Sequence, residues 1–321
     1  MEDIIYSGLL LTTPILLAAL GGAINWSAGI VNIGLDGMML IGAFVGVFVD
    51  WQTGSVLVGC IAAVVAGAIT GWLFALPITR LGANQIMAGL GLAILVPGFF
   101  GYILPIAFGQ ASTLQPGNIH GVPSWPVPLL SKIPAIGFPI FTQDPITYLS
   151  WLAIPATWLV MRRTPLGIRL RACGDNEVVA LGAGLPVKRL QELSTVIAGA
   201  LSALGGAQLA LVSVQLFNKD MTAGRGFLAL AAFYFGRGRP GMTAVAAFIF
   251  GLSDAVALRL QTQGFPDQLP EMIPYIVVIL ALIVVAVRDR VVKARALRSP
   301  GSPPSEVASA PPTPGPAPVR T

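Results

Sequence analysis

Residues 55–78 read SVLVGCIAAVVAGAITGWLFALPI, and this stretch contains no charged side chain. A helix needs about 20 apolar residues to cross the hydrocarbon core of a bilayer. Backbone groups in lipid must form their hydrogen bonds within the segment, so a run of this kind is expected to be helical. A strand of a membrane β-barrel would instead alternate apolar and polar residues. The stretch therefore predicts a membrane-spanning helix, and Leu193–Val214 and Tyr275–Val287 have the same character.

The composition of the whole chain agrees with this prediction. Of 321 residues, 55% are hydrophobic and 10% are charged, and the mean hydropathy is +0.79. A water-soluble domain carries about a quarter charged residues, so this chain has too little polar surface to be one. The net charge of +5 does not indicate nucleic-acid binding, because the basic residues gather at the ends of the apolar runs. The two cysteines, Cys60 and Cys173, provide no disulfide framework.

The apolar runs predict an all-α integral membrane protein, a bundle of about eight or nine transmembrane helices with broken or re-entrant segments. The predicted spans are 4–23, 28–49, 54–78, 84–106, 146–161, 193–214, 241–259 and 272–287. A further apolar piece at 226–236 is too short to span unless it is a half-helix packed inside the protein. The first run follows the acidic pair Glu2-Asp3, so we expect a span there and not a cleaved signal.

Lysine and arginine predict the orientation, because loops on the cytoplasmic side are enriched in them. Residues 162–192 and the segment after 287 are the richest in these bases, so both should be cytoplasmic. If 226–236 crosses the membrane, the N-terminus and the loop at 107–145 lie outside. If 226–236 only dips in and returns, the N-terminus lies inside, and the sequence leaves both alternatives open.

The predicted domain organisation is a transmembrane domain over 1–298 and a disordered cytoplasmic tail over 299–321, where proline and serine dominate. Prolines and aromatic residues alternate in the 107–145 loop, with Trp125, Phe138 and Phe141 as anchors. This mixture favours an extended, folded cap over a flexible linker.

The basic loop 162–192 contains a short predicted helix at 177–183. Asp175 and Asn176 are suitable N-caps, Glu177 suits a first helical turn, and Gly184 is a natural helix end. The simple interpretation is an ordinary cytoplasmic loop with a surface helix. The functional interpretation is a lever that sits in a groove of a motor protein and transmits its motion.

The stretch TPLGIRLRACGDNEVVALGAGLPVKR at 164–189 resembles the coupling loop of permease subunits in the branched-chain amino acid, ribose and nucleoside superfamily of bacterial ABC importers. Glu177 replaces the usual proline of that family, and Val179 replaces an alanine. The resemblance implies that this loop contacts an ATPase, through Gly174, Asp175, Asn176, Glu177, Ala180 and Gly184.

Three further blocks resemble the nucleoside branch of the same superfamily. They are GIVNIGLDGMMLIGAF at 29–44, ANQIMAGL at 83–90 and MTAGRGFLALAAFYFGRGRPG at 221–241. The aromatic residue that precedes the last proline in the family is missing here, where Gly238 and Arg239 stand. The blocks keep the family order over about 13–275, and this order makes the set specific.

Neutral amides stand in or near the predicted spans, where an unpaired polar group in hydrocarbon is costly. Asn32, Asn84, Gln85 and Gln208 could line a pathway for an uncharged sugar or nucleoside, since amides offer donors and acceptors without a fixed charge. The alternative is that they join helices or cap broken ones. Asn25 and Asn32 flank a glycine-rich break, where support of an irregular backbone is the better interpretation.

Three titratable residues are interpreted structurally. Asp36 is expected to cap a helix near the start of the second span. Asp254 lies within an apolar run, where an ion pair, for which Arg259 is a candidate partner, is favoured over a proton relay. His120 is the only histidine and has no placeable catalytic partner. The pairs Gly42/Gly46 and Gly67/Gly71 favour close helix packing.

The sequence contains no G-x-x-x-x-G-K-[ST] loop, so ATP hydrolysis is expected on other subunits. The resemblance then implies a non-enzymatic permease in the bacterial plasma membrane that binds no cofactor itself. Its expected partners are ABC ATPase subunits, a second permease, an external substrate-binding protein and membrane lipid, and no nucleic-acid polymer. Nucleosides are the favoured solute, with ribose-like sugars and branched-chain amino acids as alternatives. An autonomous secondary transporter would need matching halves, and a membrane enzyme would need an acid–base or metal cluster. Neither is evident in the sequence.

Overall fold

The computed structural model describes residues 2–109, 112–115, 117, 119–123, 125, 137–262 and 268–298. The chain divides into two units, 1–278 and 279–321, which are described separately. The predicted tail at 299–321 lies outside the described residues, and so does much of the proline-rich loop, including residues 126–136.

The described chain is mainly helical, as predicted. Its helices are α1 (Glu2–Ser27), α2 (Leu35–Thr53), α3 (Val56–Leu81), α4 (Gln85–Phe108), α5 (Gly137–Phe141), α6 (Pro145–Arg163), α7 (Pro165–Asp175), α8 (Glu177–Gly182), α9 (Val187–Gln208), the π-helical η2 (Leu209–Val214), α10 (Arg225–Gly236), α11 (Pro240–Thr262), α12 (Gln268–Glu271) and α13 (Ile273–Arg298). Two short strands, β1 (Thr113–Leu114) and β2 (Phe217–Asn218), form an antiparallel pair in the register Thr113 to Asn218.

Six of the described helices are long and apolar enough to cross a membrane, namely α1, α2, α3, α4, α11 and the continuous α9–η2 segment Val187–Val214. The predicted span at 146–161 is a helix, α6, but it is not among these six. The pieces at 226–236 and 272–287 fall in two shorter apolar helices, Arg225–Gly236 and Leu269–Val285.

Local sequence signals explain where several helices start and stop. The Asn84 side chain caps α4 by accepting hydrogen bonds from the backbone N–H groups of Ile86 and Met87, at 2.9 and 3.3 Å. Asp144 caps α6 in the same way, with Pro145 in the first helical position. Gly82 ends α3 with a left-handed φ of 68°, a conformation that glycine adopts without steric cost.

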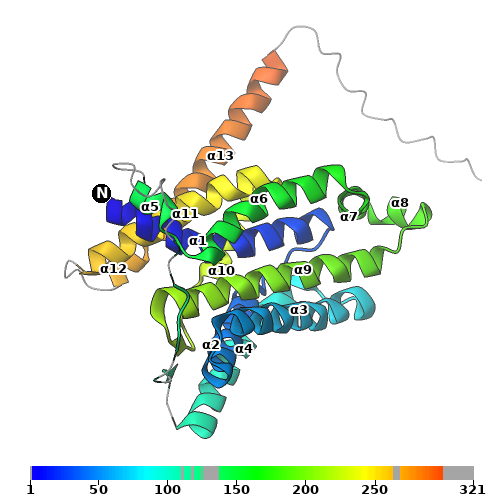
Figure 1. The fold of residues 1–321 in the computed structure, drawn as a ribbon. Helices are drawn as coiled ribbons and strands as arrows, with labels where there is room; N and C mark the ends of the chain where they lie inside the picture. The colour runs from blue at the N-terminus through cyan, green and yellow to red at the C-terminus, as the bar shows by residue number, and fades with distance from the viewer. Residues whose placement is uncertain are drawn as a thin grey trace, which may run out of the picture. The chain divides into compact units, whose positions relative to one another are not determined.

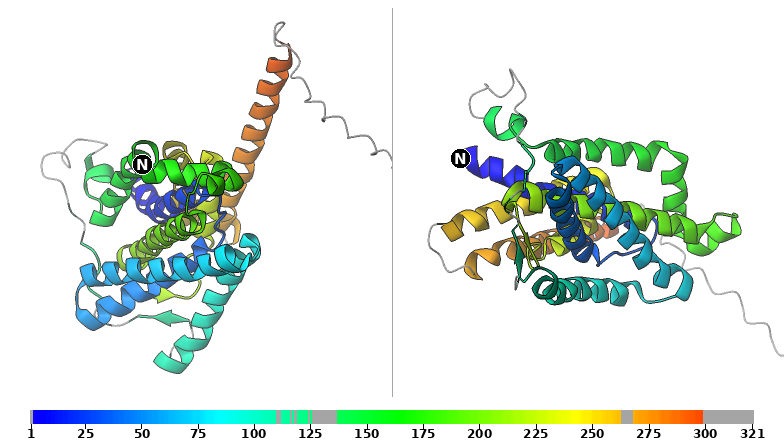
Figure 2. Two further views of the ribbon diagram at one scale, coloured as in Figure 1. Left: turned by 90° about the vertical axis from the view of Figure 1, so that its right-hand side faces the viewer. Right: turned by 60° about the horizontal axis from the view of Figure 1, so that its bottom comes forward.

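The core forms around α1, which packs against α9, α10 and α11 (Figures 1 and 2). Small residues allow α9 to approach both α2 and α3. A Cβ atom on Gly67 or Gly71 of α3 would collide with the backbone of Gly199 or Thr195, which confirms the predicted packing role of this glycine pair. Gly42 meets the backbone of Ala203 in the same manner.

The bundle has two distinguishable ends. At one, called here the coupling end, α7 and α8 lie beyond the ends of α6 and α9 (Figure 1). The other, called here the loop end, holds β1 and β2. Gly174 of α7 lies against Ser27, so α1 also finishes at the coupling end.

The chain between α9 and α10 is the main irregular segment of the bundle. Gln215, Ala223 and Gly224 have φ values of 52°, 44° and 76°, and β2 lies between them. From there α10 begins beside Asp36 and ends where Gly238 meets Trp26 and Ser27. Residues 215–236 thus lead from the loop end to the coupling end, which agrees with the crossing alternative. The predicted short helix is present as α10, and a membrane half-helix packed inside the protein stays a prediction.

Candidate functional site

The segment between α6 and α9 forms two short helices at the coupling end. Pro165 occupies the first position of α7, and the Thr164 hydroxyl accepts a hydrogen bond from Gly167 N at 3.3 Å. Asn176 closes α7 and caps α8, because its Oδ1 accepts from Val179 N at 3.1 Å. The predicted helix at 177–183 is confirmed as Glu177–Gly182, and Gly184 follows it with a left-handed φ of 77°. Of the two predicted caps only Asn176 acts as one, since Asp175 is the last residue of α7.

One close backbone approach fixes α7 to the bundle. A Cβ atom on Gly174 would lie 2.5 Å from the Ser27 carbonyl oxygen and 3.0 Å from Gly29 N, so a larger residue would push α7 away from the end of α1. Ala180 of α8 is 3% exposed. It belongs to an apolar cluster made of Ile24, Ala28, Met161, Leu170, Cys173, Ala180, Val187 and Leu190. Burial, aided by the Glu177 carboxylate, raises the pKa of Cys173, which therefore packs as a neutral thiol.

The outer face of α8 is apolar and uncovered. Val178, Val179 and Leu181 are 78%, 66% and 53% exposed. The helix of six residues is too short to span a bilayer and is flanked by polar residues. Exposed aliphatic side chains that gather on one short helix outside the spans indicate a surface that a partner covers.

Three of the four predicted pathway residues lie together near the start of α4. Asn32 is buried, and its Oδ1 accepts a hydrogen bond from Gly34 N at 2.9 Å. Gln85 accepts from Val31 N at 3.0 Å through Oε1, and Asn84 caps α4. These amides support backbone, as the break-support interpretation of Asn32 proposed, and their role in a solute pathway stays a prediction.

Asn84 and Gln85 also line a small polar cavity of about 370 Å³. Glu177 of α8 and Gln191 of α9 lie on its opposite wall. The cavity thus joins two predicted pathway residues to the segment that holds the predicted coupling residues. This juxtaposition is not evident in the sequence.

Gln208 is separate from the other three amides. It is fully buried at the end of α9, and its Nε2 donates to the Leu10 carbonyl of α1 at 3.4 Å. Its Oε1 has no hydrogen-bond partner among the described residues. Asn25 is likewise buried, with both side-chain polar atoms lacking a partner in the described part of the chain, although its carbonyl accepts from Ala28 N and Ile30 N.

Asp36 and Asp254, two of the acidic residues within the spans, lie around the start of α10, where each has a specific partner. Asp36 accepts hydrogen bonds from Gly226 N and Thr222 Oγ1, both at 3.0 Å. The predicted capping role of Asp36 is therefore confirmed, but the helix that it caps is α10 and not its own. The ion pair of Asp254 is also confirmed, with a different base.

The sequence-based partner of Asp254 was wrong. Its carboxylate pairs with Arg225 of α10, at 2.8 and 2.9 Å, while Arg259 is exposed on the surface of α11. An offset of five residues places Arg259 on another face of the helix. Arg225 also donates to the Met221 carbonyl at 3.1 Å, and Tyr275 donates to the Ala223 carbonyl at 3.2 Å. These contacts hold the irregular backbone before α10 in place.

A further acidic residue of the spans, Asp50, has a contact that sequence reasoning missed. It is fully buried at the loop end of α2 and accepts a hydrogen bond from His120 N at 3.1 Å. The His120 ring lies close by, with Nδ1 3.8 Å from Asp50 Oδ1. The contact fastens part of the 107–145 loop to the bundle, and the β1–β2 pair fastens another part. The described portion of this loop therefore packs as a folded cap.

Comparison with known proteins places these features in a family. A sequence model described as the permease component of the branched-chain amino acid transport system matches residues 4–284. The putative glucose ABC transporter permease TsgC13 of Haloferax volcanii is 34% identical over 254 residues, which cover 78% of this chain and 75% of that protein. No solved structure matches the chain.

Two bacterial relatives cover more of the chain. The nucleoside ABC transporter permease NupC of Lactococcus lactis is 31% identical over 88% of this chain and 92% of its own length. The guanosine ABC transporter permease NupQ of Bacillus subtilis is 32% identical over 88% and 91%. The same Lactococcus strain has a further nucleoside permease, NupB, that is 25% identical over 46% of this chain and 41% of its own length.

Proposed function

The chain belongs to the permease family of the branched-chain amino acid transport system, and we propose that it is one of two permease subunits of an ABC importer for nucleosides. Family membership and several apolar helices make it a multi-pass membrane protein with a transport role. Under this proposal the chain forms half of the translocation pathway and catalyses no reaction itself.

The uncovered apolar face of α8 is the observation that carries the subunit role. Val178, Val179 and Leu181 need a partner, and an ATPase groove at the coupling end would bury them. Asn176 and Gly184 shape the short helix, while Gly174 and Ala180 anchor it to α1 and to the apolar cluster. Movement of the bound ATPases would therefore reach α1 and α9 directly through packed side chains.

The remaining partners are inferred from a motif that the sequence lacks and from the permeases that are similar to this chain. Because the sequence contains no phosphate-binding loop of the G-x-x-x-x-G-K-[ST] type, ATP would be hydrolysed by two partner subunits. NupB and NupC from one organism favour a second, homologous permease over a pair of identical chains. A substrate-binding protein would deliver the solute at the loop end, and the coupling end and C-terminus would be cytoplasmic.

Nucleosides are the favoured solute because two relatives that cover most of the chain are named for nucleosides or guanosine. The putative glucose permease, at 34% identity, makes a simple sugar the second candidate. Both are uncharged polar solutes that neutral amides could pass without trapping a charge. Asn32, Asn84, Gln85 and Gln208 remain the proposed polar residues of the pathway, with Asn84 and Gln85 the most accessible because they line the cavity near α8.

The subunit role is tested by replacing Val178 and Val179 with aspartate in a tagged full-length chain and purifying the native complex. Two buried carboxylates at this contact would be costly, so we expect the co-purified ATPase and the nucleoside uptake to fall at least about tenfold. The Val→Thr pair at the same positions keeps the shape and should retain most of both. Unchanged co-purification and uptake in the aspartate variant would contradict the role of α8.

Solute identity is tested separately, through competition for uptake by the wild-type complex. Excess unlabelled guanosine or adenosine should abolish uptake of labelled nucleoside, while glucose and leucine should not. Transport of glucose alone would overturn the nucleoside assignment and leave the subunit role intact.

A further inference from the structure

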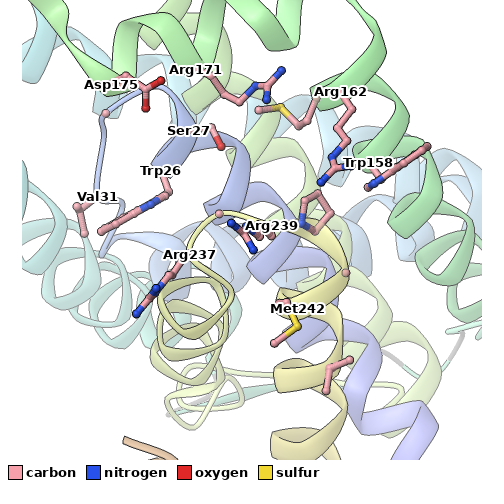
Figure 3. Close-up of a pocket in the computed structure, with 17 residues that line it drawn as sticks. Trp26, Ser27, Val31, Trp158, Arg162, Arg171, Asp175, Arg237, Arg239 and Met242 are labelled. Carbon is pink, nitrogen blue, oxygen red and sulfur yellow. The ribbon is translucent and has the colours of Figure 1, made fainter. Parts of the chain in front are cut away.

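A pocket with a volume of about 1000 Å³ lies at the coupling end. Its wall is built by the end of α1 with the loop that follows it, the ends of α6 and α7, the turn that joins α10 to α11, and the start of α11 (Figure 3). Its volume is at the upper end of the range that is typical of small-molecule binding pockets. None of the predicted pathway amides lines it, so it is distinct from the cavity beside α8.

The polar lining of this pocket is strongly basic. Arg162 and Arg171 come from α6 and α7, and Arg237 and Arg239 come from the turn between α10 and α11 (Figure 3). The only carboxylate in the lining is Asp175. Like charges gathered around one cavity repel each other, and an anion placed between them relieves this repulsion. The lining therefore favours an anionic ligand.

Two of the arginines are held in place by local contacts. The Arg162 guanidinium lies over the Trp158 ring, 5.7 Å from its centroid. Arg171 Nε donates to the Gly167 carbonyl at 3.4 Å. An ordinary cytoplasmic loop also gathers arginines, but it leaves them free to extend into water. Here they border a cavity from two sides. The enrichment of arginine in cytoplasmic loops does not by itself require this placement.

The remaining wall is apolar and belongs to α11, a candidate span, and to α6. Met242 and Val245 of α11 are each 54% exposed, and Trp158 of α6 is 40% exposed. Because α11 is one of the candidate spans, the exposed Met242 and Val245 side chains are suited to contact acyl chains. Tryptophan typically marks the level where acyl chains meet headgroups. A basic cavity directly beside an acyl-facing wall has the amphipathic character of a phospholipid and not that of a free phosphate ion.

We propose that this pocket binds an anionic phospholipid, with the headgroup in the arginine-lined part of the pocket, beside Arg162 and Arg239, and the acyl chains along α6 and α11. Basic pockets between transmembrane helices are a known mode of lipid recognition. The lipid would join the α10–α11 turn to Gly174 and Asp175 at the end of α7. It would thus steady the base of the segment that carries α8, independently of which solute the protein transports.

The experiment uses the purified full chain and measures bound lipid by native mass spectrometry during titration with phosphatidylglycerol or phosphatidylcholine. The wild-type chain should bind phosphatidylglycerol in preference to phosphatidylcholine. The double variant Arg162→Gln, Arg239→Gln should weaken this binding about thirtyfold, since each arginine near an anionic surface contributes about fivefold. The Arg→Lys pair should retain most of the affinity, because the headgroup is attracted mainly by charge.

The matched control is Arg163→Gln together with Arg169→Gln, which removes the same charge from α6 and α7 outside the pocket lining. Equal loss in this control would show a general surface effect and overturn the proposal. Saturation by inorganic phosphate without any preference for phosphatidylglycerol would overturn it in favour of a soluble anion. The wild-type lipid comparison needs no variant, so it decides the matter even if a glutamine variant fails to fold.

Discussion

The α7–α8 segment and the break between α9 and α10 both interrupt the series of membrane helices, but different forces shape them. The first is built from local signals, an Asn176 cap and a left-handed Gly184, and it touches α1 at Gly174. The second is held by polar contacts between residues far apart in sequence, from α2, α11 and α13 to α10. The difference suggests that the first segment can move as a unit, whereas the second is a fixed part of the core.

Loss of the ion pair that holds the break between α9 and α10 should have the largest effect, a fall in the stability of the fold. Asp254→Asn or Arg225→Gln leaves one charge without its partner where both side chains are less than a fifth exposed. Loss of one member of a buried pair destabilises by about 3–5 kcal/mol. We expect each variant to lower the thermal midpoint strongly and to reduce the amount of folded chain, as measured by fluorescence-detected size exclusion during heating.

The control for this prediction lies on the same helix. Arg259→Gln removes the base that sequence spacing proposed for Asp254, and it should shift the midpoint little because Arg259 is exposed. A loss in Arg259→Gln as large as that in Arg225→Gln would contradict the observed pairing. It would also remove the main reason for regarding the break as fixed.

Disruption of the contact between α7 and α1 should have the next largest effect, a loss of solute uptake. Gly174→Val places methyl groups where the Ser27 carbonyl already stands, and overpacking of this kind costs about 1–3 kcal/mol. We expect α7 to shift away from α1, with a tenfold or greater loss of uptake at normal chain abundance. Gly182→Val is the matched control, because a Cβ atom there meets nothing within 4 Å. Equal uptake in both variants would show that α7 needs no fixed contact with the bundle.

Local features were predictable from the sequence because their causes are local. Asn176 stands three residues before the amide that it caps, and Gly184 stands directly after the turn that it ends. The same reasoning located the six membrane-length helices, since each coincides with a long and mainly apolar run. The spacing of Gly67 and Gly71 likewise indicated a packing face without naming the helix that packs there.

Long-range contacts were not predictable from one sequence. Asp36 and Gly226 are separated by 190 positions, and no periodicity links them. Arg225 stands between glycines in a recognisable block, but nothing nearby indicates that its partner is Asp254 on the next long helix. For the same reason, the pathway amides could be identified as polar residues in or near the spans, while the backbone groups that they contact could not. Topology, and not local propensity, decides these pairs.

The cap of α8 should have a smaller and strictly local effect. Asn176→Ala removes the acceptor of Val179 N, which typically costs about 1 kcal/mol. We expect hydrogen exchange of the α8 amides to quicken about fivefold while the thermal midpoint stays unchanged. Asn176→Asp keeps an acceptor and should preserve the protection. A change in the global midpoint would mean that α8 is coupled to the core as tightly as the break is.

The smallest effect is expected for Gly184→Asn, because the constraint at this position is conformational and not steric. A Cβ atom there meets nothing within 4 Å, but φ is 77°. Asparagine tolerates this left-handed region, so Gly184→Asn should cost only a few tenths of a kcal/mol and leave uptake intact. Valine tolerates it poorly, and Gly184→Val should cost about 1–2 kcal/mol, loosen the turn into α9 and lower uptake while ATP hydrolysis continues. Side-by-side measurement of uptake and ATPase activity checks this order. Normal uptake in both variants would show that the turn after α8 transmits no movement, and the segment would then be a docking surface alone.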